Sequence, residues 1–312
     1  MKRIITLFFF IITYCILTHS DLSLYYAFTG LEVWFNKMIP TLLPFMILSG
    51  IMVRMQLTDG FTVFIYPIMK PLFQVSKNVC YAMIMGFLCG FPMGAKTIQD
   101  LYSHKMISKR EGEFLLAFCN NIGPVYFVGF VLPLLKRHFV LPYLLGMYGI
   151  PFVYGLFLRY TKFKDITTSS VSAISTKEAA TETQNNTFFK LLTELDNSII
   201  SAVQSILSLG GYMVLFNLIN ILPHIILKQS PIFLAPILEI SGGLRLIEDK
   251  FPLYVLLILP FGGLSCIAQT YSCIKDTPFS IADYTFHKII LVLLTALYYL
   301  GWFCIFSSSF MR

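Results

Sequence analysis

The sequence predicts an all-α polytopic membrane protein with about 8–10 transmembrane helices, in two structural repeats with broken or re-entrant helices. Three observations predict this class. Hydrophobic residues make up 56% of the 312 residues and charged residues only 12%, against roughly 25% charged residues in soluble domains. The mean hydropathy is +0.74. Apolar runs long enough to cross a bilayer recur along the whole chain.

Each expected span is an apolar run of roughly 20 residues, the length that crosses the hydrocarbon core as a helix. The candidate spans are 4–19, 36–56, 61–76, 79–101, 113–135, 139–159, 199–224, 231–247, 252–274 and 286–307. The segments 61–76 and 231–247 are short, and each contains prolines, which interrupt helices. Either segment could be a re-entrant element or a tilted helix instead of a full span.

The first apolar run follows Lys2 and Arg3 and resembles a signal peptide. No small-x-small cleavage site precedes Asp21, so we expect an uncleaved transmembrane helix. Residues 1–29 are therefore assigned to this helix and an external loop.

One long polar stretch, 160–198, divides the chain and has the Ser-, Thr-, Asn- and Glu-rich composition of a linker. Its end, 188–196, is amphipathic and is expected to run along the interface into the next span.

Basic residues stand in short segments between the apolar runs, as in membrane proteins that follow the positive-inside rule. With ten spans and the N-terminus inside, 14 of the 23 Lys and Arg residues lie inside and 8, including Lys288, lie outside, while Lys96 lies within the membrane. This bias favours that orientation. No basic helix is available to lie along phosphates, so the expected partner is the lipid bilayer and not nucleic acid.

Neither the seven Cys nor the five His have the spacing of a metal site. No CxxC pair occurs, and the His residues are scattered near span ends. The chain also contains no GxSxG, HExxH or Walker-type motif. We therefore expect no metal, no cofactor and no enzyme activity.

The two halves of the chain, 30–159 and 199–312, resemble each other. Each has a long span, a short proline-containing element and a glycine-broken run, in that order. In the broken runs, 86–97 matches 260–270, so that Lys96 stands opposite Gln269. Such paired interruptions point to the binding site of a transporter. The repeats are inverted if the short elements span fully and parallel if they are re-entrant.

The first broken run contains Gly90, Pro92, Gly94 and Lys96. Gly90 permits a turn and Pro92 suits the first turn of a helix, so a half-helix should begin here with free N–H groups at the membrane midplane. Such an N-terminus binds anions. The Lys96 ammonium then needs an anion, a partner such as Asp100, or water.

A structural interpretation of the same run stays open. Gly86, Gly90 and Gly94 have the spacing of a small-residue packing stripe. Lys96 would then snorkel, or pair with Asp100 without binding a solute.

The second broken run begins after Gly262 and Gly263, with Ser265 as the expected N-cap. Gln269 and Thr270 offer neutral polar contacts where the first run offers Lys96 and Thr97. Two facing N-termini with one lysine would form an asymmetric pocket for a small anion.

Two further polar features fall within apolar runs. Asn120 and Asn121 precede Gly-Pro and predict another unwound turn, which lines the solute site or bonds helices together. Glu239, beside Pro236, could pair with Lys96, carry protons or reach the interface beside Arg245.

The run from Gly86 to Thr97, with Asn120-Asn121, Gly262-Gly263-Leu264-Ser265 and Gln269, resembles the sporulation integral membrane proteins of the YlbJ type, which carry the nucleoside-recognition or Gate domain. The resemblance extends from about Gly30 to the last span. It implies that 30–159 and 199–312 are Gate-type repeats in a multi-pass protein of spore-forming Firmicutes. It also implies a place in the mother-cell or outer forespore membrane and dipicolinate as the solute passed toward the forespore.

The predicted function is thus a transporter or facilitator for a small organic anion, dipicolinate. The alternatives are a nucleoside or nucleobase carrier and a non-transporting sporulation scaffold or assembly factor. A second copy of the chain and other sporulation membrane proteins are further candidate partners. The predicted substrate-binding residues are Gly90, Pro92, Gly94, Lys96, Thr97, Asn120, Asn121, Gly262, Gly263, Ser265, Gln269 and Thr270.

Overall fold

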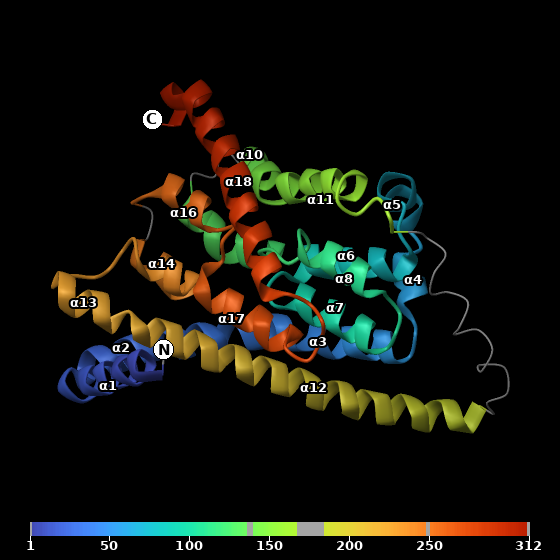
Figure 1. Cartoon of the computed structure of the whole chain (residues 1–312), viewed down its shortest axis with the longest axis horizontal. Coiled ribbons are helices and arrows are strands. Elements are labelled where there is room, and N and C mark those ends of the chain that lie inside the picture. The colour runs from blue at the N-terminus through green and yellow to red at the C-terminus, as the bar shows by residue number, and fades with distance from the viewer. Residues whose placement is uncertain (1, 136–139, 167–183, 248–249, 311–312) are drawn as a thin grey trace.

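The structure is a computed structural model that describes residues 2–135, 140–166, 184–247 and 250–310. Within these ranges every regular element is a helix, as the sequence predicts (Figure 1). Among the described residues, five helices are long and apolar enough to cross a membrane, or up to six if one pair bent by 104° counts as a single span. This is fewer than the ten expected spans, because several expected spans are broken or turn back.

The first half consists of α1 (Lys2–Thr18), α2 (Ser20–Val33), η1 (Trp34–Met38), α3 (Ile39–Arg54), α4 (Thr58–Thr62), α5 (Tyr66–Phe73), α6 (Lys77–Cys89), α7 (Met93–Ser103), α8 (Lys109–Leu116), α9 (Pro124–Tyr126), η2 (Phe127–Val131), η3 (Leu132–Leu134), α10 (Val140–Leu144), η5 (Leu145–Gly149) and α11 (Ile150–Tyr160). The second half consists of α12 (Gln184–Ile219), α13 (Ile221–Leu227), α14 (Ala235–Leu238), α15 (Ile240–Ile247), α16 (Pro252–Ile258), α17 (Gly263–Ile274) and α18 (Ile281–Phe310).

Residues 20–54 form one helical stretch of 35 residues, composed of α2, the π-helical turn η1 and α3. The expected external loop up to residue 29 is therefore wrong beyond α1. Glu32 is an acidic residue within this stretch. In the structure Glu32 pairs with Arg245 of α15, with Oε2 and Nη1 2.8 Å apart, so its charge is neutralised within the helix.

The expected amphipathic end of the linker, 188–196, forms the first turns of the long helix α12. Phe188 and Phe189 are exposed on this helix. Residues 167–183 of the expected linker lie outside the described residues.

Helices α6 and α7 form a hairpin, where the sequence predicts one span at 79–101. A Cβ on Gly94 would lie 3.2 Å from the Cα of Gly86, so the two helices lie side by side. At the open end, Asn78 Nδ2 donates to the carbonyl oxygen of Met106 at 3.1 Å. The apolar residues that suggested a span are therefore divided between two short helices whose outer ends lie together.

The second half contains a shorter hairpin, formed by α14 and α15. Gly243 packs against the backbone of Pro236 so closely that no Cβ would fit. The segment 231–247 is therefore two short helices that fold back on each other, a course that favours the re-entrant alternative. Glu239 lies at the tip, between the two helices. The other short segment, 61–76, contains α4 and α5, and α5 is half of the pair bent by 104°.

Each hairpin is followed by a helix that is broken in the middle. Residues 117–123 separate α8 from α9, and residues 259–262 separate α16 from α17. The predicted interruptions at Asn120-Asn121 and at Gly262-Gly263 are thus confirmed as breaks in helices.

The two hairpins enter from opposite ends of α12. Near the start of α12, Glu194 lies 3.7 Å from Arg54. Asp59, which follows Arg54 in the chain, pairs with Lys77 at the first residue of α6, at 2.8 Å. The α14–α15 hairpin follows α13, at the far end of α12 (Figure 1).

Each half therefore has the order hairpin, then broken helix. The sequence aligned 86–97, which forms part of the first hairpin, with 260–270, which forms part of a broken helix. In the structure the element that corresponds to the hairpin α6–α7 is instead the hairpin α14–α15. Entry from opposite ends is the arrangement that inverted repeats would produce. The repeat itself remains a prediction.

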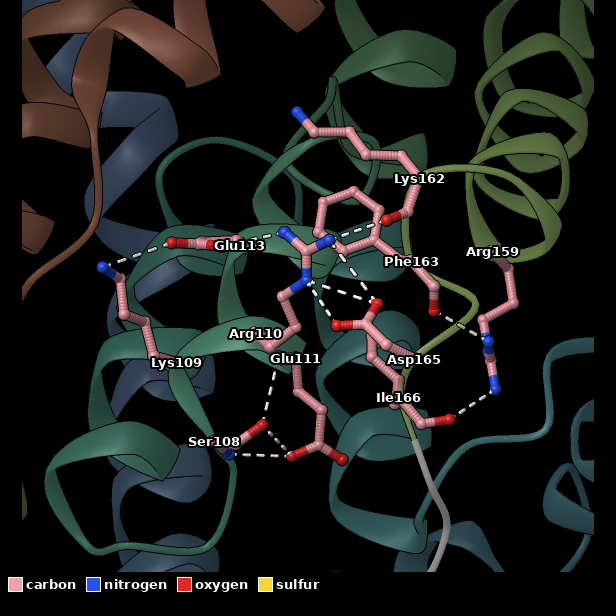
Figure 2. A network of polar contacts seen from close by, with 10 residues as sticks. All are labelled: Ser108, Lys109, Arg110, Glu111, Glu113, Arg159, Lys162, Phe163, Asp165 and Ile166. Carbon is pink, nitrogen blue, oxygen red and sulfur yellow. Dashed lines mark hydrogen bonds and ion pairs between the residues drawn. The ribbon is translucent and has the colours of Figure 1, made fainter.

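A network of polar contacts fixes the end of the molecule where α6 and α7 open (Figure 2). Ser108 and Glu111 form a capping box at the start of α8. Arg110 hydrogen-bonds to Asp165, and this bond lowers the pKa of the Asp165 carboxyl. The buried Arg159 donates to the carbonyl oxygens of Phe73, Gln74, Phe163 and Ile166. The network holds the α5–α6 corner against the end of α11.

Candidate functional site

The tip of the first hairpin meets both broken helices at one place, which we call the crossing (residues 90–92, 117–123 and 259–263). The Phe91 N–H donates to the carbonyl oxygen of Asn121 at 2.7 Å. A Cβ on Gly262 would lie 2.9 Å from the Phe91 ring. Gly90 and Gly262 have φ values of +79° and +75°, which glycine adopts without steric cost. The two interrupted runs therefore converge, as the sequence predicts.

Asn120 is a central hydrogen-bonding residue of the crossing. Its Oδ1 accepts from the Ala95 N–H at 3.3 Å. Its Nδ2 donates to Thr270 Oγ1 at 2.9 Å and to Tyr284 OH at 3.1 Å. Because the side chain is 1% exposed and bonded to three elements, its geometry favours the interhelical role over direct contact with a solute.

The N-terminus of α7 is less available to an anion than the sequence suggests. Pro92 is the N-cap residue. The Gly94 N–H donates to Gly90 at 3.2 Å, and Asn120 takes the Ala95 N–H. Close packing of Gly94 on Gly86 supports the packing interpretation of these glycines.

Lys96 has the intrahelical partner that the structural interpretation requires. Its Nζ lies 2.7 Å from Asp100 Oδ1 and 3.1 Å from Gln99 Oε1. Thr97 on the same helix is fully buried, and its hydroxyl oxygen lies 3.4 Å from that of Ser49. The Lys96 charge is therefore largely neutralised within α7.

In the second half, Gly262 and not Ser265 is the N-cap residue of α17. Ser265 lies within the helix and accepts a hydrogen bond from Gln269 Nε2 at 2.9 Å. Gly263, with φ +83°, would place a Cβ 3.0 Å from the carbonyl oxygen of Pro236. Gly263 thereby allows the second hairpin to approach the crossing.

Two cavities adjoin the crossing. The first, the apolar cavity, has a volume of about 270 Å³ and is lined by apolar and aromatic side chains with few polar groups: Phe45, Phe91, Tyr126, Phe130, Glu239 and Ser241 among them. The second, the polar cavity, has a volume of about 320 Å³ and is lined by Lys96, Gln99, Gln204, Ser205, Ser208 and Lys275 among others. Gln269 and Leu209 line both cavities, so these two residues form the wall between them.

Of the twelve predicted site residues, Pro92 and Lys96 line the polar cavity and Gln269 lines both cavities. The remaining nine line neither of these two cavities and instead shape or bond the crossing behind them: Gly90, Gly94, Thr97, Asn120, Asn121, Gly262, Gly263, Ser265 and Thr270. Most of the residues predicted from the sequence therefore lie at the crossing, and few of them line the cavities.

Glu239 and Lys37 are the charged residues that line the apolar cavity, and Glu239 is 2% exposed. Oε2 accepts from Asn217 Nδ2 at 2.9 Å and from the Gly242 N–H at 2.7 Å. Oε1 accepts from the Ser241 N–H at 3.1 Å. Glu239 therefore caps the start of α15, and its partner is neither Lys96 nor Arg245. Its position between Pro236 and Gly242-Gly243 marked it as a hairpin tip.

Lys288 is a buried lysine, at 2% exposure, although the sequence-based count assigns it to the outer side, at the start of the expected span 286–307. In the structure α18 begins at Ile281, five residues before that span, so Lys288 lies well within the helix. Lys288 Nζ donates to Asn121 Oδ1 at 2.9 Å and lies 4.2 Å from the centre of the Phe91 ring. The four-residue spacing from Tyr284 was a signal in the sequence for a polar face on this helix.

Residues 35–213 match the Gate family, described as Nucleoside recognition. The chain is also similar to the sporulation integral membrane protein YlbJ of Bacillus subtilis (strain 168), with 27% identity over 322 residues that cover 89% of this chain and 78% of that protein. No solved structure matches the chain. Since the family match spans more than half of the chain and its helices suit a bilayer, this integral membrane protein belongs to the Gate family.

Proposed function

We propose that this protein moves a small organic anion across the membrane, and that the anion is dipicolinate passed from the mother cell toward the forespore during sporulation. The observation that carries the proposal is the crossing, where a re-entrant hairpin and two broken helices meet between two cavities. Irregular backbone at membrane depth is tolerated where it is buried in protein or lines a water-filled path. Transporters place their binding sites at such interruptions.

The chemistry of the cavities supports a small aromatic acid. The apolar cavity, at about 270 Å³, approaches the lower end of the range for small-molecule sites. Aromatic side chains there suit the faces of a planar ring. The polar cavity offers Lys275 and several hydroxyl groups to a carboxylate, with Asp276 as an acidic residue in the same lining. The Bacillus relative is named as a sporulation integral membrane protein, which supports this setting.

A nucleobase or nucleoside is the second candidate, and Glu239 favours it. Its Oε1 accepts from the Ser241 N–H, and a carboxylate oxygen can accept more than one hydrogen bond. It faces an aromatic cavity with Ser241 and Gln269 nearby. An N–H group of a base would suit this acceptor, whereas a doubly ionised acid would be repelled by it.

The proposal is tested by dipicolinate flux into vesicles that contain the purified full chain. Leu209→Trp places a bulky ring in the wall between the cavities and should lower the flux at least tenfold. The matched control is Leu207→Trp, on the same helix, where the side chain is 56% exposed, and it should keep the flux.

Absence of dipicolinate flux in folded wild-type protein would contradict the proposal. Competing nucleosides and nucleobases in the same assay decide between the two solutes, since full inhibition by a nucleobase and none by other aromatic dicarboxylates would favour the second candidate.

A further inference from the structure

Lys288 has no role in either cavity as the structure stands, although it lies beside the crossing. It sits two turns into α18, and its side chain is 2% exposed. An ionisable group at this depth is costly to bury, and such groups usually mark a path for a solute or ion. The question is what balances its charge.

The contacts of Lys288 leave the ammonium without a carboxylate partner. Its Nζ donates to the neutral Asn121 amide at 2.9 Å, with the ring centres of Phe91 and Tyr284 at 4.2 and 5.7 Å. Among the described residues no Asp or Glu oxygen lies within 4.0 Å of it. An ammonium has three donor hydrogens, and here aromatic faces stand where an anion would otherwise bind.

Phe91 forms the partition between Lys288 and the apolar cavity. The Phe91 ring lines that cavity, and Lys288 does not. The Phe91 backbone is held by the bond from its N–H to Asn121, so rotation of the side chain alone would uncover the ammonium without moving the hairpin tip. The ring packs directly on Gly262, where a Cβ would lie 2.9 Å from it, so the glycine allows the ring its place over the ammonium.

Lys96, which lines the polar cavity beside the crossing, provides a contrast. It pairs with Asp100 at 2.7 Å on its own helix, so an incoming anion would gain little from its charge. Lys288 has no such neutralising partner, and its attraction for an anion would be strong in a medium of low dielectric constant.

Resting on the transport of an organic acid proposed above, we infer that Lys288 is the concealed anion-binding group of the pathway and that the Phe91 ring is its movable cover. The ligand is a small aromatic carboxylate. Its carboxylate replaces the Phe91 ring over the ammonium when that ring turns into the apolar cavity. The side chains of Phe91 and Tyr126 then flank the aromatic part of the solute.

The test combines binding and flux on the full chain in detergent and in vesicles, with dipicolinate as the probe. Phe91→Ala removes the cover and should lower the KM for dipicolinate at least fivefold. Lys288→Met should raise the KM at least tenfold and abolish the gain in the double variant Phe91→Ala with Lys288→Met. Lys288→Arg keeps the charge and should retain saturable uptake. Lys77→Met, at the outer end of the first hairpin and away from both cavities, is the control and should change the KM less than threefold.

A folded Lys288→Met protein with the wild-type KM would overturn the inference, as would a Phe91→Ala protein whose gain survives in the double variant. If Lys288→Met does not fold, Phe91→Ala and Lys288→Arg are measured instead. A KM for dipicolinate that Phe91→Ala leaves unchanged contradicts the role of the Phe91 ring as a cover. Failure of the transport proposal is distinguishable, because wild-type protein would then show no dipicolinate flux at all. In that case, stabilisation against heat by dipicolinate that increases in Phe91→Ala would still support the anion site, and its absence would overturn it.

Discussion

At the scale of single residues, the charged side chains inside this protein differ in their partners: several bond to polar groups of the protein, whereas Lys288 has no carboxylate partner among the described residues. Arg159, Glu239 and Lys96 each have protein partners that satisfy their hydrogen-bonding groups. Lys288 faces an amide and aromatic rings. The sequence could identify Lys96 as an intramembrane charge, but it could not decide between Asp100 and a solute as the partner, because the i+4 spacing suits both interpretations.

Arg159 provides a test of a structural charge. It is 3% exposed and donates to four backbone carbonyl groups. Arg159→Ala leaves those carbonyls without their donors and should lower the free energy of unfolding by about 3 kcal/mol. The measurement is thermal or denaturant unfolding in detergent.

The control is Arg110→Ala, because the Arg110 side chain is 40% exposed and exposed ion pairs contribute less than about 1 kcal/mol. Equal losses of stability in the two variants would argue against the buried role of Arg159.

Gly263 tests the approach of the second hairpin to the crossing. Its φ of +83° and the 3.0 Å distance from a Cβ to the Pro236 carbonyl oxygen leave no room for alanine. Gly263→Ala should therefore cost about 2 kcal/mol of stability. Gly211→Ala is the control, since nothing lies within 4 Å of a Cβ there and alanine favours a helix. A Gly263→Ala protein as stable as Gly211→Ala would contradict the close approach.

At the scale of elements, hydropathy predicted that helices exist but not how often they cross. The run at 79–101 has the length of a span, and nothing in its hydropathy separates a rod from two half-helices that fold back. The signal lay in Gly90 and Pro92, which marked the break, while the packing of Gly86 against Gly94 that closes the hairpin depends on contacts through space. The same limit applied to the long stretch at 20–54, where an external loop was expected up to residue 29.

The hairpin prediction is tested by labelling single cysteines in a chain whose seven native cysteines are replaced. Lys77→Cys and Ser103→Cys lie at the two outer ends of the first hairpin, and both should react with an impermeant thiol reagent from the same side of the membrane. Ser230→Cys and Phe251→Cys lie at the outer ends of the second hairpin and should both react from the opposite side. Labelling of Lys77→Cys and Ser103→Cys from different sides would contradict the hairpin and support a single span at 79–101.

At the scale of the whole molecule, the sequence established the class and the place of the crossing, and the structure supplied the geometry of the path. Composition alone fixed an all-helical membrane protein, because no soluble fold of this size covers so much apolar surface. The glycine- and asparagine-rich breaks located the crossing. The cavity walls could not be foreseen, since Leu209 and Tyr126 carry no pattern that distinguishes them from lipid-facing residues. The position of Lys288 of α18 beside the crossing also depends on packing between distant segments, which no local sequence pattern predicts.

The central claim is that a hydrated path runs past the crossing, with Gln269 on the wall that separates the two cavities. The most direct measurement is the reactivity of Gln269→Cys, as the single cysteine of the full chain in vesicles, toward small charged thiol reagents added to either side. The account predicts that the cysteine reacts and that dipicolinate slows the reaction in proportion to its occupancy of the site. A cysteine at this position that never reacts from either side, or that reacts at a rate indifferent to the solute, would contradict it.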